Sequence, residues 1–260
     1  MPRLKIAVAT AGLPLPLKKA LVRAGEWGAD AVEIDARRQI TPEQLSQTAA
    51  RQLRKMLDDL GLRVAALAFP TRRGYENSEQ LEARVEATKA TMRMAYELRA
   101  PVVINRVGHV PASADSPQWK LLVEVLTDLG AYGHHVGALL AAETGYESGD
   151  DLARLLAAIP QGAIGVSLNP GNLVLGGFSP LEAVEALGPA ILHVHATDAV
   201  RDPSGRRGET APLGEGMADF PALLGALEDA AYRGYFAIEH ASAGDPLREI
   251  PAAIQYLRKF

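Results

Sequence analysis

Eight short apolar runs alternate with longer amphipathic runs along the 260-residue chain, and this alternation restricts the fold more than any other feature. The runs have the length and apolar content that are typical of buried strands. Strands that alternate with helices pair in parallel through right-handed crossovers. Eight such units predict an α/β protein of the (β/α)8 TIM barrel fold. The expected strands are 5–10, 31–35, 63–69, 101–105, 138–143, 164–169, 191–195 and 235–239.

The segments between these runs carry helix signals. Residues 41–60 place leucines on one face at helical spacing, and Thr41, Pro42 and Gln44 form a capping-box start. The same signature precedes an expected helix over 180–187. The other expected helices are 76–99, 117–134, 149–159, 219–231 and 245–258.

A doubly wound open sheet is the main alternative to the barrel. Such sheets usually have fewer strands, and no glycine-rich dinucleotide or phosphate loop follows the first expected strand. The chain also shows no linker or low-complexity segment. We therefore expect one domain over residues 1–260.

Composition excludes several classes of function. The net charge of −4 and the isoelectric point of about 5.9 give no general attraction to nucleic acid or anionic membranes. The absence of cysteine excludes disulfides, thiolate metal sites and thiol nucleophiles. No apolar stretch is long enough for a membrane span, and the N-terminus makes a poor secretion signal. We expect a cytoplasmic protein.

Four ligand-capable side chains end the last four expected strands of the barrel. When the bulky residues of these strands face the helices, the final inward residues are Glu143, Asn169, His195 and Glu239. The first three are 26 residues apart, which is one strand–helix unit. Functional groups of such barrels gather at this end of the strands. Two carboxylates, an imidazole and an amide oxygen suit Mn²⁺, Mg²⁺, Co²⁺ or Zn²⁺.

His193 shares the inward face with His195 but lies one layer deeper. It is interpreted as a hydrogen-bonded core histidine or as a partner of the metal ligand. Glu33 and Asp35 share a face of an earlier strand, where Asp35 is expected to form a salt bridge or contact substrate.

Six motifs in order resemble the xylose isomerase-like TIM barrels, the sugar phosphate isomerase/epimerase superfamily. They span most of the chain, and no single one is decisive. The motifs are GADAVEID (28–35), LLAAETGYE (139–147), GVSLNPGNL (165–173), HVHATDAVR (193–201), PLGEGMADFPALL (212–224) and YFAIEH (235–240).

The resemblance implies a divalent metal held by Glu143, Asn169, His195 and Glu239. The family has aspartate where this chain has Asn169, and often a substrate-facing histidine where it has Asn172. Losing one carboxylate weakens a metal site, makes the metal more electrophilic or leaves the site empty. These outcomes stay open at this point.

The resemblance also implies an isomerase or epimerase that acts on a small polyhydroxylated substrate. A metal-stabilised enediolate would form while Glu143 and Glu239 remove and return protons as catalytic residues. Asn172, Asp198 and Arg201 are expected to contact substrate. Family members are commonly dimers or tetramers, so a homo-oligomer is also implied.

Eight arginines lie beyond strand ends, where they could bind an anionic substrate such as a sugar phosphate or sugar acid. Arg106 and Arg201 are the candidates whose replacement by alanine would test this binding. Arginines also decorate ordinary solvated loops, which is the plainer interpretation. The set is Arg37, Arg38, Arg72, Arg73, Arg106, Arg201, Arg206 and Arg207.

Three alternatives to an isomerase remain. Asn169 and Asn172 favour a non-catalytic or metal-free barrel that only binds a ligand. A lyase or dehydratase could use the same site, because removal of a proton beside a carbonyl also begins that reaction. DNA repair by the endonuclease branch of the family is disfavoured by six histidines and the acidic net charge.

Overall fold

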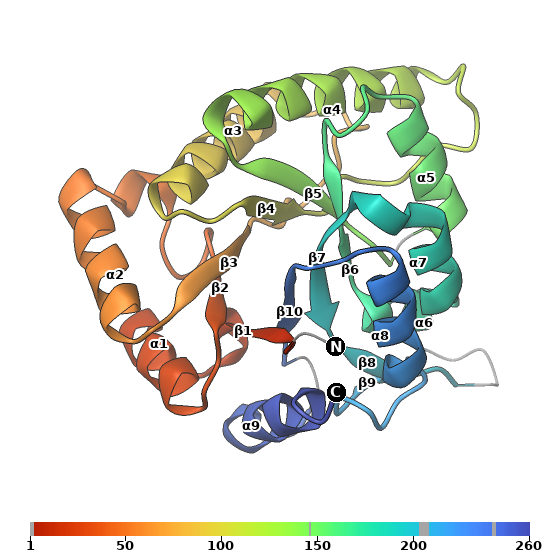
Figure 1. Cartoon of the computed structure of the whole chain (residues 1–260). Coiled ribbons are helices and arrows are strands. Elements are labelled where there is room, and N and C mark those ends of the chain that lie inside the picture. Colours follow the sequence, from red (N-terminus) through yellow and green to blue (C-terminus); the bar gives the residue numbers. More distant parts are fainter. Residues whose placement is uncertain (1–2, 146, 203–207, 241–242) are drawn as a thin grey trace.

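The computed structural model describes residues 3–145, 147–202, 208–240 and 243–260. Within them, eight parallel strands form a closed barrel in the order β1-β10-β7-β6-β5-β4-β3-β2. The expected (β/α)8 TIM barrel is confirmed, and the open sheet is excluded because β1 pairs with both β2 and β10. Figure 1 shows the helices arranged around these strands.

All eight strands lie within two residues of their expected bounds. The barrel strands are β1 (Lys5–Ala9), β2 (Ala31–Asp35), β3 (Arg63–Ala68), β4 (Val102–Asn105), β5 (Leu139–Glu143), β6 (Gly165–Leu168), β7 (Ile191–Ala196) and β10 (Tyr235–Ile238). A separate antiparallel hairpin joins β8 (Asp198–Val200) to β9 (Glu209–Ala211). The expected strands and helices did not include this hairpin.

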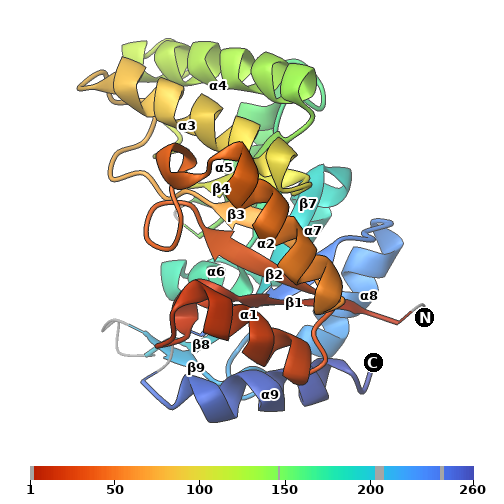
Figure 2. The same ribbon diagram turned by 90° about the vertical axis from the view of Figure 1, so that its left-hand side faces the viewer.

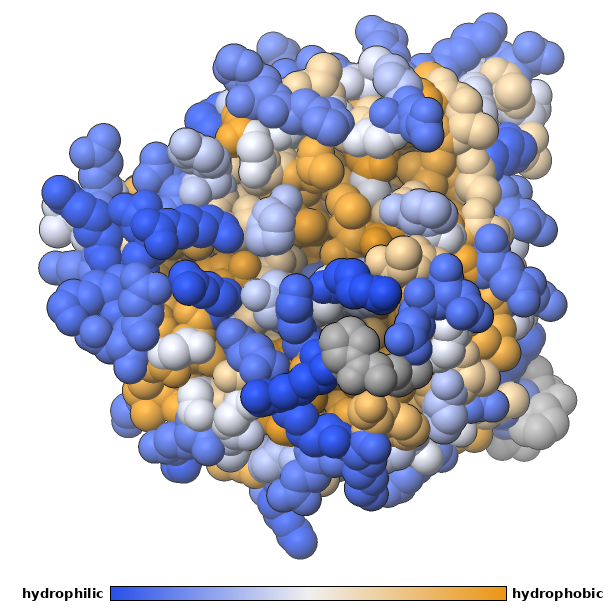
Figure 3. All heavy atoms as spheres, in the orientation of Figure 1, coloured by the Kyte–Doolittle hydropathy of each residue, from blue (hydrophilic) through white to orange (hydrophobic). Residues whose placement is uncertain are grey.

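The helices cover the outside of the barrel. They are α1 (Leu17–Glu26), α2 (Gln47–Asp59), α3 (Leu81–Glu97), α4 (Pro117–Val136), α5 (Gly149–Ala157), α6 (Pro170–Gly176), α7 (Pro180–Leu187), α8 (Phe220–Asp229) and α9 (Pro246–Leu257). Hydrophilic side chains dominate the outer edge of the face in Figure 3, with hydrophobic ones between them. Amphipathic helices that bury one stripe produce this distribution. None of the helices in the described ranges is long and apolar enough to cross a membrane.

The prediction of one continuous helix over 41–60 is wrong, because the segment forms a short turn followed by a separate helix. The capping box at Thr41 is present, but it begins a 3-10 turn over Pro42–Gln44. Leu45 then leaves the helical region with ψ of 80°, and Ser46 caps α2 by accepting a hydrogen bond from the N–H of Ala49. The chain therefore has two helix starts where the hydrophobic spacing suggested one.

A layer of small side chains fills part of the barrel interior. Ala7, Ala31, Ala65 and Ala237 form a buried cluster separate from the main core between strands and helices. Because alanine is small, the larger inward residues of the same strands have room to meet across the axis. In Figure 2 both termini lie at one end of the barrel, and α6 and the β8–β9 hairpin lie at the other.

Candidate active site

His195 is the centre of a cluster of charged side chains inside the barrel. It lies on β7 and is 3% exposed. Its Nδ1 lies 3.1 Å from Oε1 of Glu143, at the end of β5. Its Nε2 lies 2.9 Å from Oε2 of Glu33, on β2. One imidazole thus joins carboxylates from two different parts of the barrel.

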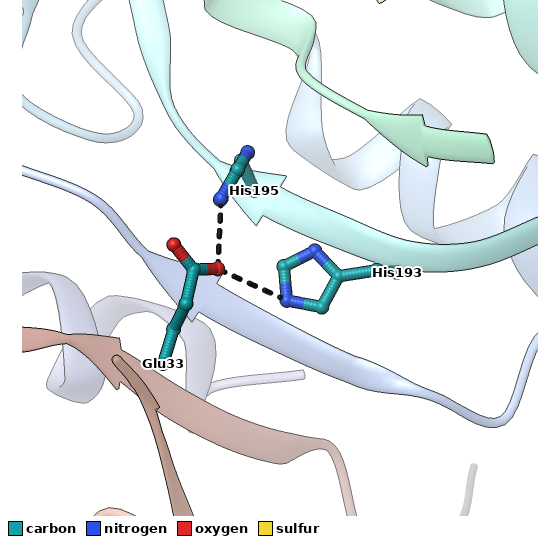
Figure 4. A group of neighbouring side chains, drawn as sticks. All are labelled: Glu33, His193 and His195. Carbon is teal, nitrogen blue, oxygen red and sulfur yellow. Dashed lines mark hydrogen bonds and ion pairs between the residues drawn. The ribbon is translucent and has the colours of Figure 1, made fainter. Parts of the chain in front are cut away.

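Glu33 also approaches the second histidine of β7. Its Oε2 lies 3.4 Å from Nε2 of His193, and Figure 4 shows both rings directed at this one carboxylate. The Nδ1 of His193 lies 3.1 Å from the hydroxyl of Ser167 on β6. The expectation that His193 is a buried partner beneath His195 agrees with these contacts. The importance of Glu33 was not recognised from the sequence, although its inward phase on β2 was a usable signal.

Glu143 is held by three hydrogen-bond donors. Besides His195, Nε of Arg106 lies 3.1 Å from its Oε2, and Nδ2 of Asn169 lies 3.1 Å from its Oε1. Burial raises the pKa of Glu143, but these neighbours outweigh it and bring the pKa down to about 2. The carboxylate therefore stays ionised at neutral pH.

The same contacts and charges also shift the pKa values of His195, Glu239 and His193. Burial lowers the pKa of His195, but the charges of Glu33, Glu239 and Glu143 raise it well above its usual value. Burial raises the pKa of Glu239, with Glu143 and Glu33 adding to the effect and His195 opposing it. Burial and the charge of His195 keep His193 neutral by lowering its pKa.

Asn169 presents its amide N–H, not its oxygen, to this cluster. Its Oδ1 accepts the N–H of Asn172 at 3.0 Å and thereby caps α6. The same Oδ1 accepts the hydroxyl of Thr197 at 2.6 Å. Thr197 Oγ1 itself accepts the N–H of Gly171 at 3.0 Å, so its single hydrogen is available for Asn169. The amide orientation is thus determined by one backbone N–H and one hydroxyl, and Nδ2 faces Glu143 and His195.

Three of the four expected metal ligands fit a divalent cation. Atoms of Glu143, His195 and Glu239 lie within 4.8 Å of one another, and the two carboxylates are partly buried. Asn169 does not offer the fourth acceptor, because its oxygen is already bound twice. The role of Asn169 as an amide-oxygen ligand therefore stays a prediction, and in this structure its Nδ2 faces Glu143. A second group with the same spacing consists of Glu33, His193 and His195.

Asp198 is engaged by the backbone of its own loop. Its carboxylate accepts the N–H groups of Ala199, Gly214, Gly216 and Ala218 at 2.9–3.1 Å. The side chain is 2% exposed and holds the segment after the β8–β9 hairpin in place. This contact explains the Gly214-Glu215-Gly216 turn, because a side chain on Gly216 would overlap the carboxylate.

The other residues expected to contact substrate differ in whether they touch the cluster around His195. Arg106 reaches the cluster through Glu143. The backbone of Asn172 is bonded to Asn169, and its Cβ lies against Gly145. The guanidinium of Arg201 lies beside Gly177, past the end of α6. Asp35 accepts the N–H groups of the turn that follows β2 and lies 3.7 Å from the guanidinium of Arg38.

Comparison with known proteins agrees with this fold. The sequence is 25% identical over 247 residues to inosose dehydratase of Geobacillus thermodenitrificans, covering 80% of each chain. The structure resembles a xylose isomerase domain protein from Planctomyces limnophilus, with 26% identity, a TM-score of 0.86 and coverage of 99% and 98%. It also resembles a D-tagatose 3-epimerase-like protein, with 20% identity, a TM-score of 0.80 and coverage of 98% and 96%.

The family model described as xylose isomerase-like TIM barrel matches residues 21–260. This match covers all the barrel strands except β1, and the resemblance inferred from the six motifs is thereby confirmed. The chain belongs to the xylose isomerase-like TIM barrel family.

Proposed function

We propose that this protein is an isomerase or epimerase that moves a proton at a carbon beside a carbonyl group of a small polyhydroxylated substrate. The observation that supports it is the pair Glu143 and Glu239, whose oxygens converge with His195 within 4.8 Å. Both carboxylates follow barrel strands at the end where such enzymes place their catalytic groups. Removal and return of a proton need a carboxylate that acts first as base and then as acid, and this pair supplies two candidates.

Glu143, His195 and Glu239 would hold a divalent metal, either Mn, Mg, Co or Zn. When bound, the metal would supply positive charge that stabilises the enediolate form of the substrate. Glu33 would keep the imidazole of His195 oriented through its contact with Nε2, leaving Nδ1 directed at Glu143.

The two glutamates have unequal surroundings, and their roles follow from this difference. Glu143 already receives hydrogen bonds from Arg106 and Asn169, which reduces its basicity and favours a role in holding and orienting. Glu239 is the better candidate to take the proton from carbon. A proton on Glu239 could then return to the neighbouring carbon, which completes the isomerisation.

A dehydratase is the second candidate. The relative from Geobacillus thermodenitrificans is an inosose dehydratase. Dehydration begins with the same removal of a proton beside the carbonyl. The hydroxyl on the next carbon then takes up a proton and leaves as water, so that a carbon–carbon double bond forms. The site described above could perform the first step of either reaction.

The test is exchange of substrate hydrogen with solvent. The protein, supplied with Mn²⁺, is incubated in D₂O with ketoses, sugar acids, sugar phosphates and inososes, and deuterium incorporation is followed by NMR. Glu239→Gln should lower the rate at least about 100-fold. Glu82→Gln, an exposed glutamate of α3, is the matched control and should not change it.

The products separate the candidates. A positional isomer or epimer with deuterium at carbon supports the isomerase, whereas an unsaturated product supports the dehydratase. Binding without exchange for every substrate would overturn both and favour the non-catalytic barrel.

A further inference from the structure

A cavity of about 390 Å³ opens directly beside Glu143. Its walls come from the loop after β3 (71–77) and the loop after β4 (106–109). This volume lies within the range of small-molecule sites. A substrate held at Glu143 would extend into this cavity. The lining includes Thr71, Arg72, Arg73, Glu76, Arg106 and His109.

Buried hydrogen bonds hold the two loops together. Asn105, which is 1% exposed, accepts the N–H and the hydroxyl of Thr71 at 3.1 Å. Its Nδ2 donates to the hydroxyl of Tyr75 at 2.7 Å, and Tyr75 N–H donates to the carbonyl of Val107 at 2.8 Å. Tyr75 is fully buried. The backbone that carries the cavity's arginines is therefore fixed before any ligand binds, which reduces the entropy cost of binding.

The structure separates the arginines that line this cavity from those that do not. Arg37 donates to the carbonyl of Pro70 and lies over the ring of Phe69, at 5.3 Å from its centroid. Arg38 lies beside Asp35. Arg201 lies beside Gly177, and Arg206 and Arg207 are outside the described residues. Arg72, Arg73 and Arg106 converge on the cavity from its two loops.

The cationic groups of the cavity differ in how far they are neutralised. Arg73 pairs with Glu79 at 2.9 Å, and Arg106 uses its Nε to bind Glu143 at 3.1 Å. Arg72 forms no ion pair within the part of the chain that the structure describes. The charge of Arg72 is therefore not balanced by a carboxylate. Arg73 and Arg106 are paired, but each guanidinium has further N–H groups that a ligand could use.

The same cavity offers an unused hydrogen-bond acceptor. Oε2 of Glu76 is buried without a hydrogen-bond partner and lies where a side chain on Gly74 or Gly108 would stand. A buried carboxylate oxygen costs free energy unless a donor reaches it. A hydroxyl group of a bound ligand would supply that donor if the Glu76 side chain, which lines the cavity, turned this oxygen towards it. The lining thus combines positive charge with an acceptor for hydroxyls.

We propose that this cavity binds the anionic end, a carboxylate or a phosphate, of a polyhydroxylated substrate. Arg72, Arg73 and Arg106 bind the anion, because guanidinium groups match both anions through paired hydrogen bonds. Glu76 accepts a hydroxyl of the same molecule. The inference rests on the proposed function, since it places the other end of the substrate at Glu143.

The experiment compares matched anionic and neutral ligands by calorimetry. D-fructose 6-phosphate is paired with D-fructose, D-glucuronate with D-glucose, and inorganic phosphate is measured alone. The proteins are the unmodified chain, Arg72→Ala/Arg73→Ala and Arg72→Lys/Arg73→Lys. Arg51→Ala removes an exposed arginine of α2 and serves as the control.

In the unmodified protein, one anionic member should bind at least about tenfold more tightly than its neutral counterpart. The double alanine variant should lose this preference, the double lysine variant should keep part of it, and Arg51→Ala should keep it fully. Preference for the phosphate or for the carboxylate identifies the anion.

Equal binding of anionic and neutral ligands, or a preference that survives the double alanine variant, would overturn the proposal. Deuterium exchange into a neutral sugar distinguishes this failure from failure of the proposed function. If such exchange occurs while anions show no advantage, the chemistry stands and only the anion subsite is wrong.

Discussion

Two layers of the barrel interior are built on different principles, although β2 contributes a residue to each. The alanine layer, made of Ala7, Ala31, Ala65 and Ala237, is apolar and small. The charged layer, made of Glu33, Glu143, His193, His195 and Glu239, buries ionisable groups against one another. Ala237 pairs with His195 in the sheet, so the change from one layer to the other occurs between neighbouring residues.

The comparison shows how a packing layer supports a functional one. Alanines leave the axial space that lets Glu33 on β2 reach β7 across β1 and β10. Burying several ionisable groups is costly unless each has a partner. The stability of the charged layer therefore depends on its central cation, whereas that of the alanine layer depends on volume.

The largest effect is expected from His195→Ala, which removes the cation among three carboxylates. The free energy of unfolding should fall by about 3–5 kcal/mol, because carboxylates are left buried without their partner. Urea unfolding near neutral pH measures it. The control is His134→Ala, whose ring contacts the carbonyl of Gly162 at the surface and should cost under about 1 kcal/mol. Similar losses for both variants would contradict the central role of His195.

Acid should weaken the charged layer through Glu143. Burial raises its pKa, but the neighbouring donors depress it from 4.5 to about 2 in the folded protein. A depressed carboxyl pKa stabilises the fold above about pH 4.5, and this stabilisation of roughly 3 kcal/mol is lost as the pH falls towards 2. Glu143→Gln should show a shallower loss of stability over this range than the unmodified protein. Parallel pH profiles would contradict the assignment.

Asn169→Asp adds a carboxylate to the charged layer and should increase its affinity for a divalent cation. The affinity for Mn²⁺ should rise by about 10- to 100-fold, because an oxygen replaces the N–H that now faces Glu143. Titration calorimetry measures the change. Asn172→Asp adds the same charge three residues away and is the matched control. A metal affinity that is unchanged in Asn169→Asp would contradict a place for residue 169 beside the metal.

The smallest effect is expected in the alanine layer. Ala237→Val adds two methyl groups to a fully buried position and should cost about 1–2 kcal/mol through overpacking. Thermal and urea unfolding measure it. Ala252→Val, at an exposed position of α9, provides the comparison and should cost less. Equal costs would mean that the interior has spare volume.

Much of the fold could be predicted from the sequence because period-2 and helical spacings are local signals. The inward phase of His193 and His195 on β7 followed from alternation alone. The two-part segment before α2 was missed because the φ/ψ break at Leu45 leaves no strong residue signal. The β8–β9 hairpin was missed because its strands have three residues each.

The site was harder to predict where it depends on contacts across the barrel. Glu33 and His195 are 162 residues apart, and no spacing rule joins them. The orientation of the Asn169 amide depends on the hydroxyl of Thr197, which follows β7, as well as on the N–H of Asn172. The four backbone bonds of Asp198 likewise require the folded loop.

The cap that Asn169 provides to α6 has a consequence for how such a site can change over time. Its Oδ1 caps the helix, while its Nδ2 faces Glu143, so a change at the second atom leaves the cap in place. An exchange between asparagine and aspartate alters a single atom and keeps the cap. The position can therefore switch the charge of the site without endangering the fold. Such a residue lets a lineage move between more and less negatively charged forms of one site by a single substitution.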